Sequence, residues 1–235
     1  MRYGLKVFLS AILALCIWVG VLFGCVEGFA LQRSFFESQD ARLGIHERMH
    51  VSEDDYTKAM GNVLSYIKGE RDSISTNITY NDKARDMFNE KEAEHMVDVK
   101  DLYLNFRFVA IVCVVFAVLL LLILILDAPR EFIAVFSVGY LRMSIIFMIC
   151  LGALGIYAAI DFTSFWNAFH GVFFSNDLWL LNPATDFMIR MLPEAVFQAL
   201  VTRILLVFVG VFMIIGLGCF IYLLRRKKAS LVLYS

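Results

Sequence analysis

The four histidines are the side chains best suited to proton transfer near neutral pH, because imidazole has an ordinary pKa of about 6.5. They are His46, His50, His95 and His170, and all four lie outside the long apolar stretches of the sequence. General acid–base chemistry in a polar or interfacial region is therefore the first chemistry to consider.

His46 and His50 have the i, i+4 spacing that would place two metal ligands on one face of a helix. The segment lacks the HExxH order of zinc proteases, and no third ligand lies nearby in the sequence. A solvated polar surface is the favoured interpretation of these two residues. We therefore expect neither a metal nor a cofactor.

His95 precedes an apolar run by about a dozen residues, which places it roughly 15 Å above the hydrocarbon at a rise of 1.5 Å per residue. Asp98 lies three residues further on the same helical face and could orient or charge-stabilise the imidazole. An ordinary hydrogen-bonded surface histidine is the alternative interpretation.

His170 follows another apolar run and is surrounded by aromatic residues of the kind that favour a membrane interface. Asn176, Asp177 and Trp179 come shortly after it in a polar, turn-rich stretch. His95 and His170 both stand just outside the membrane end of an apolar run, so they could meet across a helical bundle.

The elements that would position these residues are membrane-spanning helices. The 235 residues are 60% hydrophobic and only 18% charged, far from the composition of a soluble domain. A spanning helix needs about 20 apolar residues, and four stretches qualify: 1–26 (apolar from residue 5), 106–126, 138–160 and 201–224. The first could instead be a secretory signal peptide, but its apolar run is longer than a signal peptide requires.

Basic residues near the ends of these stretches prefer the cytoplasmic side of a membrane. They predict that both termini are cytoplasmic, with a short cytoplasmic turn at 127–137 and a tail at 225–235. Segments 27–105 and 161–200 would then face outward in a cell membrane. The basic residues that carry this prediction are Arg2, Lys6, Arg130, Arg142, Arg225, Arg226, Lys227 and Lys228.

The segment 27–105 has helical periodicity in two places. Ser52 is a plausible N-cap followed by three acidic residues, and apolar residues continue at helical spacing until Gly69. A second helix is predicted to begin near Asn81 and Asp82 and to run into the membrane, because no glycine or proline interrupts it. The predicted fold is an all-α membrane protein in which four transmembrane helices carry a helical extracellular cap.

Several other functions have little support. A net charge of −1 offers no basic surface for nucleic acid, and the span interiors lack the charged relay of a transporter. The five cysteines lie in or beside apolar runs, and we interpret them as small apolar residues. No GxSxG elbow is present, although Ser164 and Ser175 leave a serine nucleophile formally open.

With four spans and this order of loops, the chain resembles the lipoprotein intramolecular transacylases of Gram-positive bacteria. The resemblance is carried by His95-Met96-x-Asp98-Val99-Lys100 before the second span and by His170-x-x-Phe173-Phe174-x-Asn176-Asp177-x-Trp179-x-x-x-Pro183 after the third. It implies an acyltransferase whose substrate is a membrane lipoprotein with a diacylglyceryl group on its N-terminal cysteine. It also implies that the sn-2 acyl chain moves to the cysteine's own α-amino group, giving a lyso-form lipoprotein, and that His95 and His170 are catalytic.

This reaction suits the residues. A neutral histidine can take a proton from an attacking amine, and the transfer from ester to amide needs no nucleotide. One histidine would act as the base while the other polarises the ester carbonyl, and the sequence does not assign the two roles. Asp98, Asn176, Asp177 and Trp179 are candidates to orient the imidazoles or bind the substrate. The alternative is a noncatalytic membrane sensor or interaction protein with an extracellular helical cap.

Overall fold

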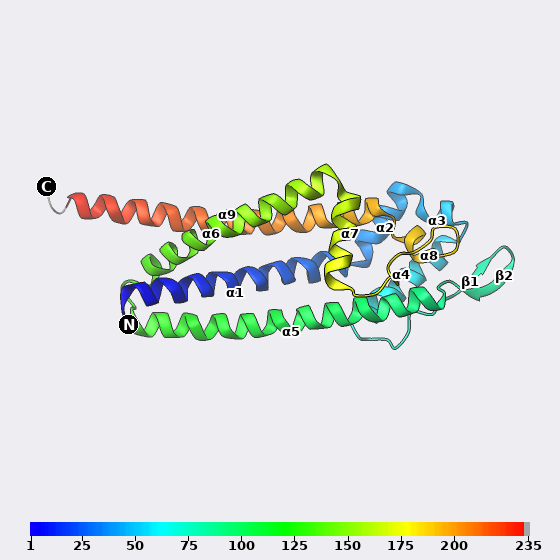
Figure 1. The fold of residues 1–235 in the computed structure, drawn as a ribbon, viewed down its shortest axis with the longest axis horizontal. Coiled ribbons are helices and arrows are strands. Elements are labelled where there is room, and N and C mark those ends of the chain that lie inside the picture. Colours follow the sequence, from blue (N-terminus) through cyan, green and yellow to red (C-terminus); the bar gives the residue numbers. More distant parts are fainter. Residues whose placement is uncertain (233–235) are drawn as a thin grey trace. The chain divides into compact units, whose positions relative to one another are not determined.

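The computed structural model describes residues 1–232, with side chains to residue 228. The described chain is mainly helical, and Figure 1 shows its elements in sequence order. They are α1 (Tyr3–Ala30), α2 (Arg33–Leu43), α3 (Ile45–Met49), α4 (Glu53–Ile67), β1 (Asn77–Tyr80), β2 (Lys83–Asp86), α5 (Glu90–Asp127), α6 (Phe132–Ile160), α7 (Phe162–Phe173), α8 (Phe187–Met191) and α9 (Glu194–Val232).

Four of the described helices, α1, α5, α6 and α9, are long and apolar enough to cross a membrane. Two of them, α5 with 38 residues and α9 with 39, are longer than a crossing of the hydrocarbon requires. The first 16 residues of α5 are rich in charge, and its apolar run starts only at Phe106. Helix α9 continues through the basic run to Val232, and the last three residues of the predicted tail lie outside the described residues.

The chain divides into two compact units. The first unit comprises Met1–Cys25, Phe108–Ile160 and Ile204–Ser235. The second unit comprises Val26–Arg107 and Asp161–Arg203. The second unit is therefore assembled from two segments far apart in the sequence, and each contains one of the histidines of interest, His95 and His170.

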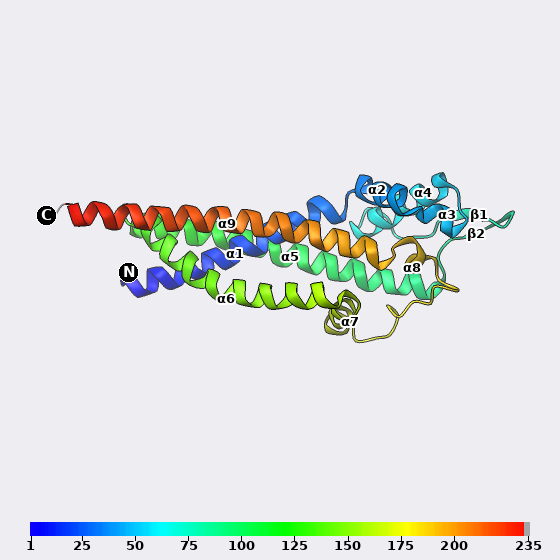
Figure 2. The same ribbon diagram turned by 90° about the horizontal axis from the view of Figure 1, so that it is seen from above.

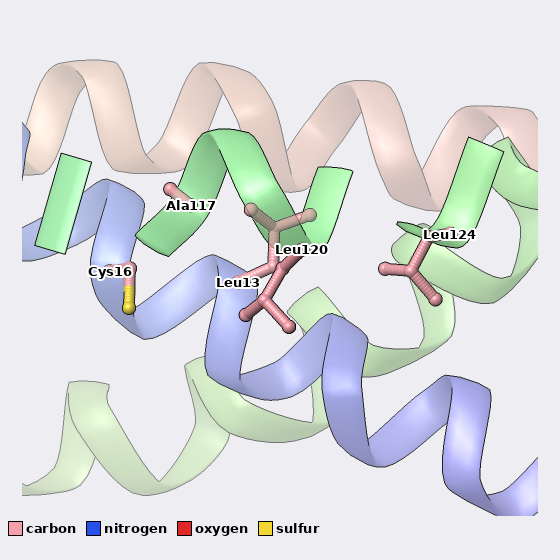
Figure 3. Close-up of a cluster of buried hydrophobic side chains, with 5 residues drawn as sticks. All are labelled: Leu13, Cys16, Ala117, Leu120 and Leu124. Atoms are coloured by element: carbon pink, nitrogen blue, oxygen red, sulfur yellow. The ribbon is translucent and has the colours of Figure 1, made fainter. Parts of the chain in front are cut away.

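The core of the first unit forms where α1 and α5 pack together. Figure 3 shows Leu13 and Cys16 from α1 facing a row of small and branched side chains from α5: Ala117, Leu120 and Leu124. Cys16 is a free thiol inside this apolar cluster. The cysteine therefore acts as a packing residue, as its sequence context predicts.

Helices α2, α3 and α4 cluster in the second unit (Figures 1 and 2). The start of α4 confirms the sequence prediction, because the Ser52 side chain accepts a hydrogen bond from the backbone N–H of Asp55 at 3.1 Å. Three acidic residues then occupy the first turn, where the helix dipole favours negative charge. The buried residues Tyr56, Met60 and Val63 form the inner face of this helix.

The predicted helix start at Asn81 and Asp82 is wrong. These residues form the two-residue loop of a hairpin in which β1 pairs antiparallel with β2, with Tyr80 opposite Lys83. Their φ angles of 52° and 61° are left-handed, as a type I′ turn requires. Asn and Asp favour both helix caps and left-handed turns, so their presence alone did not distinguish the two.

Candidate active site

Helix α5, which carries His95, begins at a reciprocal cap. The Asn89 side chain accepts from the backbone N–H of Glu92 at 3.0 Å, and the Glu92 carboxylate accepts from the backbone N–H of Asn89 at 2.8 Å. This is the capping-box arrangement. His95 lies one turn further along, is 7% exposed, and has a buried Nδ1 without a hydrogen-bond partner among the described residues.

His170 lies on α7, which starts immediately after the third apolar helix ends. Asp161 caps this helix by accepting from the backbone N–H of Ser164 at 2.9 Å and from its hydroxyl at 2.6 Å. The sequence predicts that segment 161–200, which contains His170, is an outer loop, whereas the structure places His170 in the last turn of α7 with 9% of its surface exposed. The hydroxyl of Ser164 is therefore engaged in the helix cap.

A backbone hydrogen bond determines the tautomer of His170. Its Nδ1 lies 2.7 Å from the carbonyl oxygen of Trp166, and a carbonyl can only accept. Nδ1 must therefore carry a hydrogen, which leaves the lone pair of the neutral ring on Nε2. That nitrogen is the one able to take a proton.

The two imidazoles come together within the second unit. Their ring centroids are 6.2 Å apart with an angle of 35° between the planes. Phe174 contacts both rings, with centroids 5.5 Å from His95 and 5.6 Å from His170. Trp179 stacks on His170 at 4.9 Å. The sequence expectation that these histidines could meet therefore agrees with the geometry.

Burial keeps both histidines uncharged near neutral pH. Desolvation lowers the pKa of His95 to about 4, and the neighbouring His170 acts in the same direction. Desolvation also lowers the pKa of His170, although its bond to the Trp166 carbonyl partly opposes this change. The site therefore presents two neutral imidazoles, each with one N–H and one lone pair.

The four predicted orienting residues take different positions. Asp98 accepts a hydrogen bond from the Asn176 side chain at 2.8 Å, joining α5 to the segment after α7. The negative charge of Asp98 favours protonation of His95 and so opposes the lowering of its pKa by burial. Trp179 contacts His170, and Asp177 accepts through its backbone carbonyl from the Leu180 N–H.

Further hydrogen bonds, which the sequence does not predict, join the same two segments. The Asn89 amide donates to Asp186 at 2.8 Å, and the Lys91 ammonium donates to the Leu180 carbonyl at 2.6 Å. The Glu92 carboxylate also accepts from the backbone N–H of Met188. Asn89-x-x-Glu92 is a recognisable capping-box pattern, so the sequence contained a signal for the start of α5 that the Asn81 prediction overlooked.

The other two histidines, His46 and His50, lie in and just after the short helix α3. The His46 ring and its backbone N–H both bond to the buried Asp40 carboxylate, at 2.7 and 2.8 Å. Helix α3 ends at Met49, and His50 follows it with a left-handed φ of 56°. His46 therefore has a structural partner. In the part of the chain described, no group of three or more His, Cys, Asp or Glu side chains could hold a metal.

The four long apolar helices define the class as a helical membrane protein. A model of the family described as lipoprotein intramolecular transacylase Lit matches residues 11–197. The chain belongs to this family, and it is an acyltransferase. The family membership favours the enzyme over the noncatalytic sensor that the sequence left open.

Solved structures agree in fold. The membrane integral lipoprotein intramolecular transacylase Lit from Bacillus cereus has a TM-score of 0.75 and 21% identity, and the match covers 97% of this chain and all of that one. Two structures of that protein with one histidine replaced, by arginine or by alanine, each have a TM-score of 0.72 and 21% identity. The match to the arginine variant covers 97% of this chain and 95% of that one. The match to the alanine variant covers 96% of each chain. A comparison with curated proteins finds no match.

Proposed function

We propose that this transacylase moves the sn-2 acyl chain of a diacylglyceryl-cysteine lipoprotein to the α-amino group of the same cysteine, with His95 and His170 as its catalytic residues. The observation that carries the proposal is the pairing of the two neutral imidazoles within the second unit, 6.2 Å between ring centroids. The product is a lyso-form lipoprotein with an amide at its N-terminus and a free hydroxyl at sn-2.

His170 is the proposed general base. Its Nδ1 is committed to the Trp166 carbonyl, so Nε2 is free to accept a proton from the amine as the amine nitrogen attacks the ester carbonyl carbon. When the tetrahedral intermediate collapses, the bond between the carbonyl carbon and the sn-2 oxygen breaks. His170 then returns the proton to that oxygen, so no proton is gained or lost overall.

His95 is the proposed donor to the ester carbonyl. Its pKa of about 4 leaves it neutral at physiological pH, with one N–H available to the oxygen that becomes negative in the transition state. A preorganised donor in a buried site stabilises developing charge more than a solvated one does. This role requires no protonated histidine.

Few catalytic groups are needed because nucleophile and ester belong to one molecule. Correct orientation of two such groups can lower a barrier by about 7–11 kcal/mol. We propose that Asp177 and Trp179 help to orient the substrate, Trp179 through its stacking on His170. The Asp98 to Asn176 bond would hold the two walls of the site together.

The proposed location of the site is the outer face of a bacterial cell membrane, with both termini in the cytoplasm. The basic residues of the N-terminus and of the run after Leu224 support this orientation. Its consequence is that the second unit meets membrane lipid and the lipoprotein substrate after export of the substrate.

A crossover experiment tests the reaction itself. The purified protein would be incubated, without ATP or added metal, with two synthetic diacylglyceryl-cysteinyl lipopeptides, one of them deuterated in its sn-2 acyl chain and carrying a different peptide. We expect each peptide to keep its own acyl chain and its original mass, with fragmentation placing that chain on the α-amine. Exchange of labels would contradict an intramolecular transfer, and loss of an acyl mass would indicate hydrolysis.

A further inference from the structure

Glu92 is a carboxylate with no exposed surface, and it lies one helical turn before His95. Burying an ionised carboxylate is unfavourable unless hydrogen bonds compensate. One oxygen accepts from the backbone N–H of Asn89, which completes the cap of α5. The other accepts from the backbone N–H of Met188, a residue 96 positions away.

The hydrogen bond from the Met188 N–H to Glu92 is not part of the helix cap. A capping box uses the glutamate only toward its own helix, whereas the second oxygen of Glu92 binds the segment that follows His170. The bond therefore joins the start of α5, the helix that carries His95, to α8. The site and its two segments all belong to the second unit.

Two residues just before Glu92 make further bonds to the segment that follows His170. The Asn89 amide donates to Asp186, a carboxylate that is 4% exposed and also accepts from the backbone N–H of Asn182 at 2.7 Å. The Lys91 ammonium donates to the Leu180 carbonyl. We call this set, Asn89, Lys91, Glu92 and Asp186, the carboxylate clamp. It holds the start of α5 to residues 180–188.

The clamp lies next to the catalytic pair along the helix. His95 follows Glu92 by three residues and therefore shares its face of α5. The imidazole of His95 has no hydrogen bond at Nδ1 within the described chain, so its placement depends on the backbone that carries it and on contacts such as Phe174. A misplacement of about 1 Å in a catalytic group can reduce a rate about a hundredfold.

We propose that Glu92 is a positioning residue for transacylation, which holds His95 at its working distance from His170 through the bond to the Met188 N–H. This inference rests on the proposed function, because it presupposes that the two histidines act together. Glu92 itself does not touch the reacting atoms.

Removal of the carboxylate would leave the half-buried N–H of Asn89 and the buried N–H of Met188 without their acceptor. Glu92→Ala should therefore lower kcat at least tenfold while KM changes less than twofold, because substrate contacts remain. Glu92→Gln keeps one acceptor oxygen and should fall between Glu92→Ala and the wild type. Glu94→Gln is the matched control, since Glu94 is an exposed carboxylate on the same turn and should leave kcat unchanged.

The assay would use the lipopeptide conversion at a temperature well below the unfolding midpoint of every variant, so that the folded fraction is equal. If Glu92→Ala does not fold, the kcat of Glu92→Gln alone tests the positioning role of Glu92. A folded Glu92→Gln or Glu92→Ala protein with wild-type kcat would overturn the positioning role.

His95→Asn, measured in parallel, separates the two proposals. Loss of activity in His95→Asn together with wild-type kcat in the Glu92 variants would refute only the role of Glu92. Full activity in His95→Asn would refute the catalytic pair, and with it the reason for positioning.

Discussion

At the scale of single residues, the two histidines differ in how their nitrogens are occupied. His170 has one nitrogen fixed by a backbone carbonyl, which makes the other a base, whereas His95 is more deeply desolvated and has a pKa of about 4. Neither property follows from residue spacing. The sequence could predict which two histidines meet, but their roles depend on a hydrogen bond within α7 and on burial that only the folded chain creates.

The pKa of His95 can be measured directly. Protein labelled with ¹³C in its histidine rings has only four such signals, and His95→Asn identifies the one that belongs to residue 95. We expect that signal to remain at the neutral position as the pH falls below 6.5 and to move only near pH 4. Titration at or above pH 6.5 would contradict the burial that underlies the proposed donor role.

The same pKa predicts the direction of a stability change. The unfolded chain takes up a proton on residue 95 near pH 6.5, whereas the folded chain does so near pH 4. The unfolded state therefore binds more protons between these values, and the folded state loses stability as the pH falls through this window. His95→Asn should reduce this dependence.

At the scale of elements, α4 shows where sequence reasoning succeeds. A serine cap, acidic first turn and periodic apolar face all agree there, and the helix starts after Ser52 as predicted. The predicted start of α5 at Asn81 and Asp82 is wrong because Asn and Asp favour both helix caps and left-handed turns. In the folded chain, these two residues form the turn that joins β1 to β2. The reciprocal cap between Asn89 and Glu92 was the better signal.

The packing of α1 against α6 gives an element-scale prediction. A Cβ at Gly139 would stand 2.5 Å from Ser10 Cβ and 2.8 Å from the Val7 backbone oxygen, so Gly139→Ala must push the helices apart. We expect a loss of about 1–3 kcal/mol in stability, the usual cost of overpacking. The measurement is the unfolding midpoint in detergent.

Gly152→Ala is the control, because Gly152 lies on the same helix α6 and its Cβ would meet nothing within 4 Å. A Gly139→Ala protein as stable as Gly152→Ala would contradict the close contact between α1 and α6.

At the scale of the whole molecule, composition and the positions of the apolar runs predicted the four long helices, because hydrocarbon thickness imposes a length that is visible in the sequence. The hydrogen bonds around the candidate site could not be predicted from the sequence in the same way. Its partners, such as Asn89 with Asp186 and Asp98 with Asn176, are about 80 to 100 residues apart. Polar residues at such separations show no periodicity that would pair them.

Membrane orientation is testable with single cysteines at exposed positions and a thiol reagent that does not cross membranes. Lys83→Cys on the hairpin should react in intact cells, whereas Arg130→Cys between α5 and α6 should react only after permeabilisation. The wild-type protein, with its five native cysteines, provides the background. The reverse labelling pattern would contradict cytoplasmic termini and an outward-facing site.

The most direct test of the central claim is the conversion of a synthetic diacylglyceryl-cysteinyl lipopeptide by the wild-type protein, His95→Asn and His170→Asn, followed by mass spectrometry with fragmentation. We expect the wild type to place the sn-2 acyl chain on the α-amine, and each folded variant to lose at least a hundredfold in rate, the usual contribution of a general acid or base. Acyl transfer at the wild-type rate in either folded variant would contradict catalysis by the histidine pair.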